Sequence, residues 1–196
     1  MKRFRKILIV LLAILVPVSI GFGFNFFSGE SSDSAENQAM TVEGTLTINQ
    51  ISEAQNLVPG DKICKGVTMN ITSSAVSLLR VKVDIYCADS KTAETDIAPI
   101  KNAGDNWLKG SDGYYYYTQG VKNGDIVKLA EDGIYFNGLN DNVDMNKYQG
   151  KKIKVVANAE LVQAKHGVFA EKWGLSENKD GDIYTKLKKI SNDQGQ

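Results

Sequence analysis

The chain has 196 residues, of which 42% are apolar and 23% charged, the composition of an ordinary globular protein. Its 23 basic and 23 acidic residues balance, but four basic ones lie within the first six residues, which leaves 19 basic against 23 acidic in the remainder. This distribution argues against a nucleic-acid partner. One histidine and two cysteines exclude zinc sites built from several such ligands and most histidine-based catalytic triads.

The N-terminus is hydrophobic behind its basic cluster. Residues 7–20 carry no charge, and the hydrophobic stretch reaches Phe27. Fourteen residues suit the apolar core of a signal peptide, whereas a membrane-spanning helix needs about 20. Small residues near the end of the stretch favour cleavage by signal peptidase between Gly23 and Phe24. An uncleaved membrane anchor over residues 7–27 is the alternative, and in both cases most of the chain is exported.

The remaining sequence divides into three further parts. After a signal or anchor at 1–23, a flexible leader is predicted over residues 24–40, because residues 28–40 are small, polar and acidic. Residues 41–190 carry the patterns of a folded β domain, and residues 191–196 are predicted to be a disordered tail.

Period-two alternation marks most of the folded part. At 41–49, Val42, Leu46 and Ile48 fall on one face of a predicted strand. Further strands are predicted at 63–71, 79–86, 114–118, 125–129, 133–136 and 151–162. Short alternating strands between turns predict an all-β, antiparallel β-sandwich.

Helical signals are few and lie near the C-terminus. Residues 168–173 can form one or two turns that end at Gly174. The spacing of Ile183, Leu187 and Ile190 predicts a second short amphipathic helix.

The chain contains Gly-Thr-Leu at 44–46, Pro-Gly-Asp-Lys at 59–62, and Asn-Lys-Tyr-Gln-Gly at 146–150 before a predicted strand. Together these strings resemble the TasA and camelysin family of exported Gram-positive surface and biofilm-matrix proteins. Trp107 and the four tyrosines at 114–117 look like the clostridial branch, whose members follow a SipW-type signal peptide.

The resemblance implies a jelly-roll or Ig-like sandwich that polymerises into matrix fibres, with the N-terminal segment of one subunit completing the sheet of the next. Strand addition at a sheet edge and an open head-to-tail contact would both serve this purpose. The expected partner is therefore a second copy of the chain, with no catalytic residue, metal or cofactor. The expected assembly segment comprises Phe26, Phe27, Val42, Leu46 and Ile48. A monomeric binding module anchored through residues 7–27 is the alternative function.

Some members of that family have been described as metalloproteases. The chain has no His-Glu-x-x-His motif, and its lone His166 lies between Lys165 and Gly167, a context typical of a solvated loop. Ser176 and Lys179 match a Ser-x-x-Lys spacing without its partner motifs. Acidic runs at 140–144 and 178–182 could supply oxygen ligands to calcium, but neither has EF-hand spacing, and turn-forming Asn and Asp residues explain both more simply.

The sequence does not decide whether the two cysteines form a disulfide. Export favours a bond between Cys64 and Cys87. Cys87 continues the apolar face of its strand, but Cys64 is out of phase with Ile63 and Val67, so a simple hairpin places the thiols on opposite faces. A bulge at 65–66 would turn Cys64 inward and permit the bond.

The run of four tyrosines at 114–117 is the most unusual feature of the composition. Alternation sends two rings to the core and two outward. The outward pair is predicted either to form an interface or to stabilise the sheet by cross-strand contacts.

Overall fold

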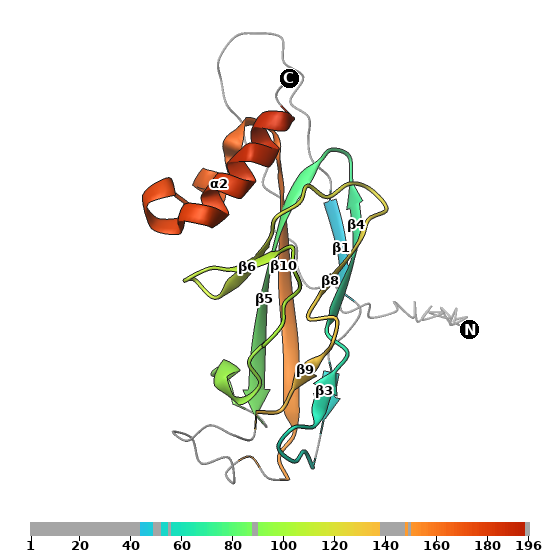
Figure 1. Ribbon diagram of the computed structural model, residues 1–196. Coiled ribbons are helices and arrows are strands. Elements are labelled where there is room, and N and C mark those ends of the chain that lie inside the picture. The colour runs from blue at the N-terminus through green and yellow to red at the C-terminus, as the bar shows by residue number, and fades with distance from the viewer. Residues whose placement is uncertain are drawn as a thin grey trace, which may run out of the picture.

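Antiparallel strands make up most of the described part of the chain (Figure 1). The structure, a computed structural model, describes residues 44–48, 52–54, 56–87, 90–137, 148 and 150–194. The predicted signal segment with Gly23 and Phe24 lies outside these residues, as do Phe26, Phe27 and Val42. The all-β prediction can therefore be compared with the structure from residue 44 onward, and there it is confirmed.

The described strands form two larger sheets and one small ribbon. The first sheet has the order β1-β4-β8, formed by Gly44–Ile48, Val67–Ser73 and Ile126–Leu129. The second has the order β2-β10-β5-β7-β6, formed by Ser52–Ala54, Ile153–Gln163, Ser77–Cys87, Tyr114–Tyr117 and Trp107–Lys109. The ribbon pairs β3 (Lys62–Cys64) with β9 (Ile134–Tyr135).

The pair of β5 and β10 is the central element of the larger sheet. The two strands are 11 residues each and stay in register from Ser77 opposite Gln163 to Cys87 opposite Ile153. Valine and isoleucine recur on one face of both strands, where β-branched side chains pack well against a pleated surface. The alternation at 79–86 and 151–162 thus predicted both strands correctly.

The main core contains side chains from both larger sheets. Met69 and Ile71 of β4 belong to one buried cluster with Val81 and Ile85 of β5. Neighbouring side chains of a strand point to opposite faces, so this cluster uses only one face of β5. The two sheets therefore form two layers around a shared core.

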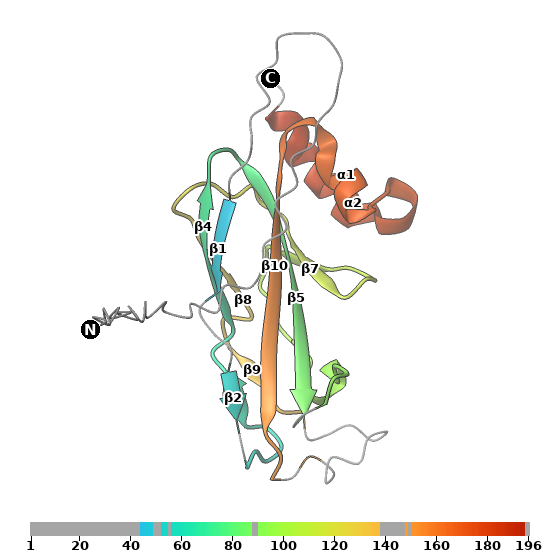
Figure 2. The same cartoon turned by 180° about the vertical axis from the view of Figure 1, so that it is seen from behind.

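A smaller core lies on the other face of the β5–β10 sheet. Helices α1 (Val168–Trp173) and α2 (Glu177–Asp193) cover one end of that face, on the side away from β1 and β4 (Figures 1 and 2). Leu78 and Tyr116 of the sheet are buried together with Phe169 and Leu187 of the helices. Neither helix, nor any other in the described part of the chain, has the length and apolar character needed to cross a membrane.

Both helices begin and end for local reasons. Helix α1 ends at Gly174, which has a φ of 64° and caps the helix through its backbone N–H. Helix α2 begins after Ser176, whose backbone N–H donates to Asp180 Oδ2 at 2.9 Å. The sequence predicts a disordered tail from residue 191, whereas α2 continues to Asp193, because Ser191 is buried and its Oγ accepts the N–H of Gly167.

The single strand predicted at 63–71 is wrong in one respect. The chain leaves one sheet and enters another at Lys65 and Gly66, which separate β3 from β4. Gly66 has a φ of 91° and lies directly against the backbone of Leu129 and Ala130. Only a residue without Cβ fits this close approach, so the break in the strand depends on the glycine.

Candidate functional site

The N-terminal strand β1 lies at an outer edge of its sheet. Among the strands that the structure describes, it pairs with β4 alone, in an unbroken antiparallel register from Gly44 opposite Ser73 to Ile48 opposite Met69. Of the predicted assembly segment, the structure includes Leu46 and Ile48, and both belong to this strand. An edge strand at the start of a chain can leave its sheet without disturbing the order of the other strands.

Hydrogen bonding assigns the two sides of β4. Ile71 donates to the carbonyl of Asp125 at 2.9 Å and accepts from Gly124 at 2.8 Å, so its backbone faces the β8 side. Backbone groups alternate in direction along an antiparallel strand, so Asn70 and Thr72 face β1. Their partners in the register are Thr47 and Thr45. These pairs fasten β1 to the sheet.

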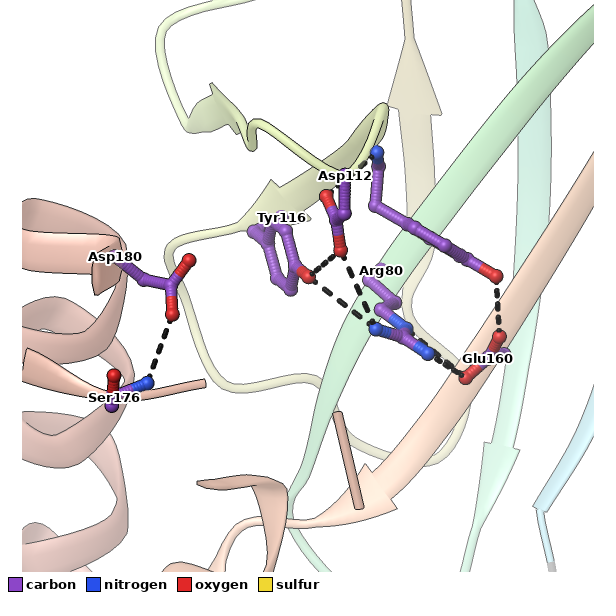
Figure 3. Close-up of polar contacts among 7 residues, drawn as sticks. Arg80, Asp112, Tyr116, Glu160, Ser176 and Asp180 are labelled. Carbon is purple, nitrogen blue, oxygen red and sulfur yellow. Dashed lines mark hydrogen bonds and ion pairs between the residues drawn. The ribbon is translucent and has the colours of Figure 1, made fainter. Parts of the chain in front are cut away.

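The densest polar cluster of the described residues surrounds Arg80 on the outer face of β5 (Figure 3). Its Nε and Nη2 donate to Glu160 Oε2 at 3.0 and 2.8 Å, across to the opposite residue of β10. Its Nη1 donates to the hydroxyl of Tyr116 at 3.3 Å, which in turn donates to Asp112 Oδ2 at 2.6 Å. Tyr114 donates to the second oxygen of Glu160 at 2.9 Å.

The guanidinium also lies between aromatic rings. It is 4.0 Å from the ring centroid of Tyr114 and 5.0 Å from that of Trp173 in α1. Cation–π contacts of this kind stabilise partly buried arginines. Burial raises the pKa of Tyr116, and its hydrogen bond to Asp112 raises that pKa further. The pKa of Tyr114 is raised by burial and by its bond to Glu160.

The Arg80 cluster fastens the helices to the sheet. Two carboxylates, one guanidinium and two phenols satisfy one another, and no buried side-chain nitrogen or oxygen in the described residues lacks a hydrogen-bond partner. The arginine lies within ion-pair distance of both carboxylates, with Nη1 3.8 Å from Asp112 Oδ2 and Nη2 2.8 Å from Glu160 Oε2. Through these contacts the cluster joins β5, β7 and β10 to Trp173 of α1.

The tyrosine run follows the predicted alternation, but its outward pair is not a solvent-facing interface. Tyr115 and Tyr117 contribute to the main core, whereas Tyr114 and Tyr116 contribute to the core beneath the helices. Tyr116 is fully buried, with its ring centroid 5.8 Å from that of Trp173. The helices that cover this face account for the difference.

The cysteines are both buried and are not joined by a disulfide. Ile63 and Cys64 are both buried, because the pairing of β3 with β9 shifts register between Lys62 and Cys64. Burial raises the pKa of the Cys64 thiol, although hydrogen bonds with the backbone of Gly66 and Ile134 partly oppose this effect.

The other predicted candidates are dispersed. His166 is exposed in a short turn, and Ser176 is the exposed residue that precedes α2. The acidic run at 178–182 lies in the first turns of α2, where the backbone of Gly181 departs from helical geometry and Asp180 Oδ2 accepts the N–H of Ser176. The run at 140–144 lies outside the described residues. The part of the chain that the structure describes contains no group of three or more His, Cys, Asp or Glu residues placed to hold a metal ion.

Sequence reasoning missed the Arg80 cluster. Arg80 and Glu160 are 80 positions apart and meet only because β5 and β10 pair. The sequence does show charged side chains on the outer face of two otherwise apolar strands. From alternation alone, however, such residues are predicted to face solvent rather than each other.

Comparison with known proteins adds no assignment. No protein-family model matches this chain, and no curated protein matches it. The resemblance to the TasA and camelysin family therefore stays a prediction, and β1 is the described element that this prediction concerns most directly.

Proposed function

We propose that this chain is an exported cell-surface or biofilm-matrix protein that assembles with copies of itself by exchanging its N-terminal strand. In this proposal the two layers form a jelly-roll or Ig-like sandwich, and β1 of one copy pairs with β4 of the next. The observation that carries it is the place of β1: an edge strand paired with β4 alone, directly after the predicted leader.

Strand exchange is energetically inexpensive because the same pairs form in both states. The five register pairs between β1 and β4 would be remade between copies, so the exchanged and closed forms differ mainly in the leader and in the entropy of association. Rising protein concentration then favours exchange. A head-to-tail exchange that does not close on itself produces a filament.

Thr47→Pro is the substitution that tests the proposal most directly. Thr47 lies opposite Asn70, at a position whose N–H points to β4, and proline has no N–H to donate. Thr47→Ala keeps the N–H and serves as the matched control. Electron microscopy of residues 24–196 at rising concentration should show filaments for the unchanged and Thr47→Ala chains and dispersed particles for Thr47→Pro.

Deletion of residues 24–49 provides a second arm. Under strand exchange, the deletion abolishes filaments and leaves a folded body that synthetic peptides covering residues 41–49 can bind. Dispersed particles for the unchanged chain at every concentration would contradict the proposal and favour the monomeric, membrane-anchored binding module.

A further inference from the structure

In the described part of the chain, β8 is the second outer edge of the β1-β4-β8 sheet. Val127 and Leu129 lie opposite Met69 and Val67, whose backbone groups share the orientation of Ile71 toward β8. The backbones of Ile126 and Lys128 therefore point away from the sheet. The N–H of Ala130, just after the strand, also points outward, whereas its carbonyl lies against Gly66 and accepts the N–H of Gly133 at 2.8 Å. Outward N–H and C=O groups of this kind are a template for pairing with another chain.

Two of these outward groups are already occupied. The indole Nε1 of Trp107 donates to the carbonyl of Lys128 at 2.8 Å. The N–H of Ala130 donates to the carbonyl of Ala103 at 3.2 Å. Both partners belong to residues 102–107, the stretch that leads into β6, which we name the guard segment.

The guard segment is fixed by its own contacts. Asn102 Oδ1 accepts the N–H of Gly104 at 3.0 Å, and Asn102 Nδ2 donates to Asp132 Oδ2 at 3.0 Å. The N–H of Trp107 donates to the carbonyl of Gly104 at 3.1 Å. The Trp107 ring is buried and packs on Tyr117 at 5.0 Å between centroids. A loop held this firmly keeps the indole N–H on the edge.

We propose that the guard segment prevents β8 from pairing with β8 of a second copy of this chain, so that self-association at this sheet is restricted to the β1 edge. The latent partner is a second β8 in antiparallel orientation. This goes beyond the strand exchange proposed above, because it concerns a different edge and holds whether or not β1 exchanges.

Register arithmetic identifies Lys128 as the controlling position. If two β8 strands pair about Val127, Ile126 lies opposite Lys128 of the other copy. The hydrogen bond from the N–H of Ile126 then needs the carbonyl of Lys128 as its acceptor. Pairing about Lys128 needs the same carbonyl and also the N–H of Ala130. Pairing about Ile126 would place Gly124 of the other copy beside Lys128, where the indole of Trp107 already lies against the carbonyl, so only the two bonds between the Ile126 residues remain. Every register with more than these two bonds is therefore blocked by Trp107.

The outward side chains of β8 explain why pairing with a second copy needs to be prevented. Ile126 has 64% of its surface exposed, the highest of the exposed large apolar side chains in the described residues. In the register about Val127 it would lie beside the aliphatic part of Lys128 from the other copy, on a shared outer face. An exposed isoleucine on an unpaired edge favours aggregation unless the edge is covered.

Trp107→Phe in the full chain tests the guard. Phenylalanine keeps an aromatic ring against Tyr117 but has no N–H for the carbonyl of Lys128. Each variant also carries Thr47→Pro, so that exchange of β1 does not contribute. Size-exclusion chromatography with light scattering is run in mild detergent at rising concentration. The chain with Thr47→Pro and no other substitution should stay monomeric, and the chain that also carries Trp107→Phe should shift from monomer to dimer. Hydrogen exchange should slow at the amides of Ile126 and Lys128 in the dimer.

Three further variants make the result specific. Asn102→Ala loosens the guard from the surface without touching the core and should give the same shift to a smaller extent. Adding Ile126→Lys to Trp107→Phe should restore the monomer. Val127→Ala weakens the core side of the same strand and should leave the chain monomeric. The proposal is overturned if the Trp107→Phe chain is folded by circular dichroism and remains monomeric. It is also overturned if Val127→Ala dimerises to the same extent. If Trp107→Phe does not fold, a monomeric Asn102→Ala chain overturns the proposal in its place.

Discussion

Arg80 and Glu160 face each other directly across β5 and β10, and both Nε and Nη2 of the arginine donate to the same carboxylate oxygen. The guanidinium side chain is 11% exposed and the carboxylate side chain 41%. The pair therefore lies between a surface ion pair and a buried one. Its position beneath Trp173 makes it the polar link between the sheet and the helices.

Arg80→Lys should lower the free energy of unfolding by about 1–2 kcal/mol, because lysine keeps the charge but loses the planar fork and the aromatic stacking. The value is at the low end for charged hydrogen bonds, since water screens the exposed side of Glu160. Urea denaturation measures the change. The control is Glu131→Gln, which breaks the exposed pair with Lys128 and should change stability by less than about 0.5 kcal/mol. Equal effects of the two substitutions would contradict the structural role of Arg80.

Stability should fall in alkaline solution because of the tyrosine run. Burial foremost raises the pKa values of Tyr114, Tyr115 and Tyr116 in the folded state. The unfolded chain then loses these protons first, so the tyrosine contribution is fully present below about pH 10 and is lost as the pH rises through the folded-state pKa values.

Tyr116→Phe separates this effect from other alkaline titrations. The variant should lose about 1 kcal/mol at neutral pH, where the hydrogen bond to Asp112 is missing. Above about pH 10 its stability should decline less steeply, by at most about 1.4 kcal/mol per pH unit. Urea midpoints at neutral and alkaline pH give both quantities. Parallel decline of the two chains would show that Tyr116 does not contribute.

Much of the fold could be predicted because alternation and helical spacing are local signals. The strands at 79–86 and 151–162 and the helix ending at Gly174 were all predicted from them. The order of strands could not be predicted, since the pairing of β1 with β4 and of β5 with β10 depends on contacts distant in sequence. The three-residue strands β2 and β6 are too short to show a period.

The candidate site was predictable only in part for the same reason. The edge strand β1 carries a clear alternating pattern, so its existence was predicted, but its edge position was not. The sequence at Trp107 gives no sign that the indole reaches the carbonyl of Lys128 in another sheet. Contacts that join two sheets become visible only when the topology is known.

Gly66→Ala should destabilise the chain far more than a methyl group added at a glycine with open space around it. An added Cβ would lie 2.2 Å from the carbonyl oxygen of Ala130 and 2.7 Å from that of Leu129, and both are backbone atoms. The φ of 91° adds strain for any L-residue. Together these effects should cost more than about 3 kcal/mol.

Gly60→Ala is the matched control for Gly66→Ala. Gly60 has nearly the same φ, 92°, but nothing lies within 4 Å of an added Cβ. The loss should be only the backbone strain, about 1–2 kcal/mol. Thermal and urea unfolding of both variants separate steric contact from strain. Similar losses at the two positions would show that the chain does not approach Ala130 as closely as the structure has it.

The thiols of Cys64 and Cys87 should be unreactive in the folded chain. Both side chains are buried, and burial raises the pKa of Cys64, which disfavours the reactive thiolate. Treatment with iodoacetamide near neutral pH should leave the native mass unchanged. In denaturant without reductant, both thiols should be alkylated, because no disulfide joins them. If denatured protein prepared from an oxidising compartment resists alkylation until a reductant is added, a disulfide forms under those conditions. The segment around Gly66 must then bring Cys64 within the Cα separation of about 4.4–6.8 Å that a disulfide requires.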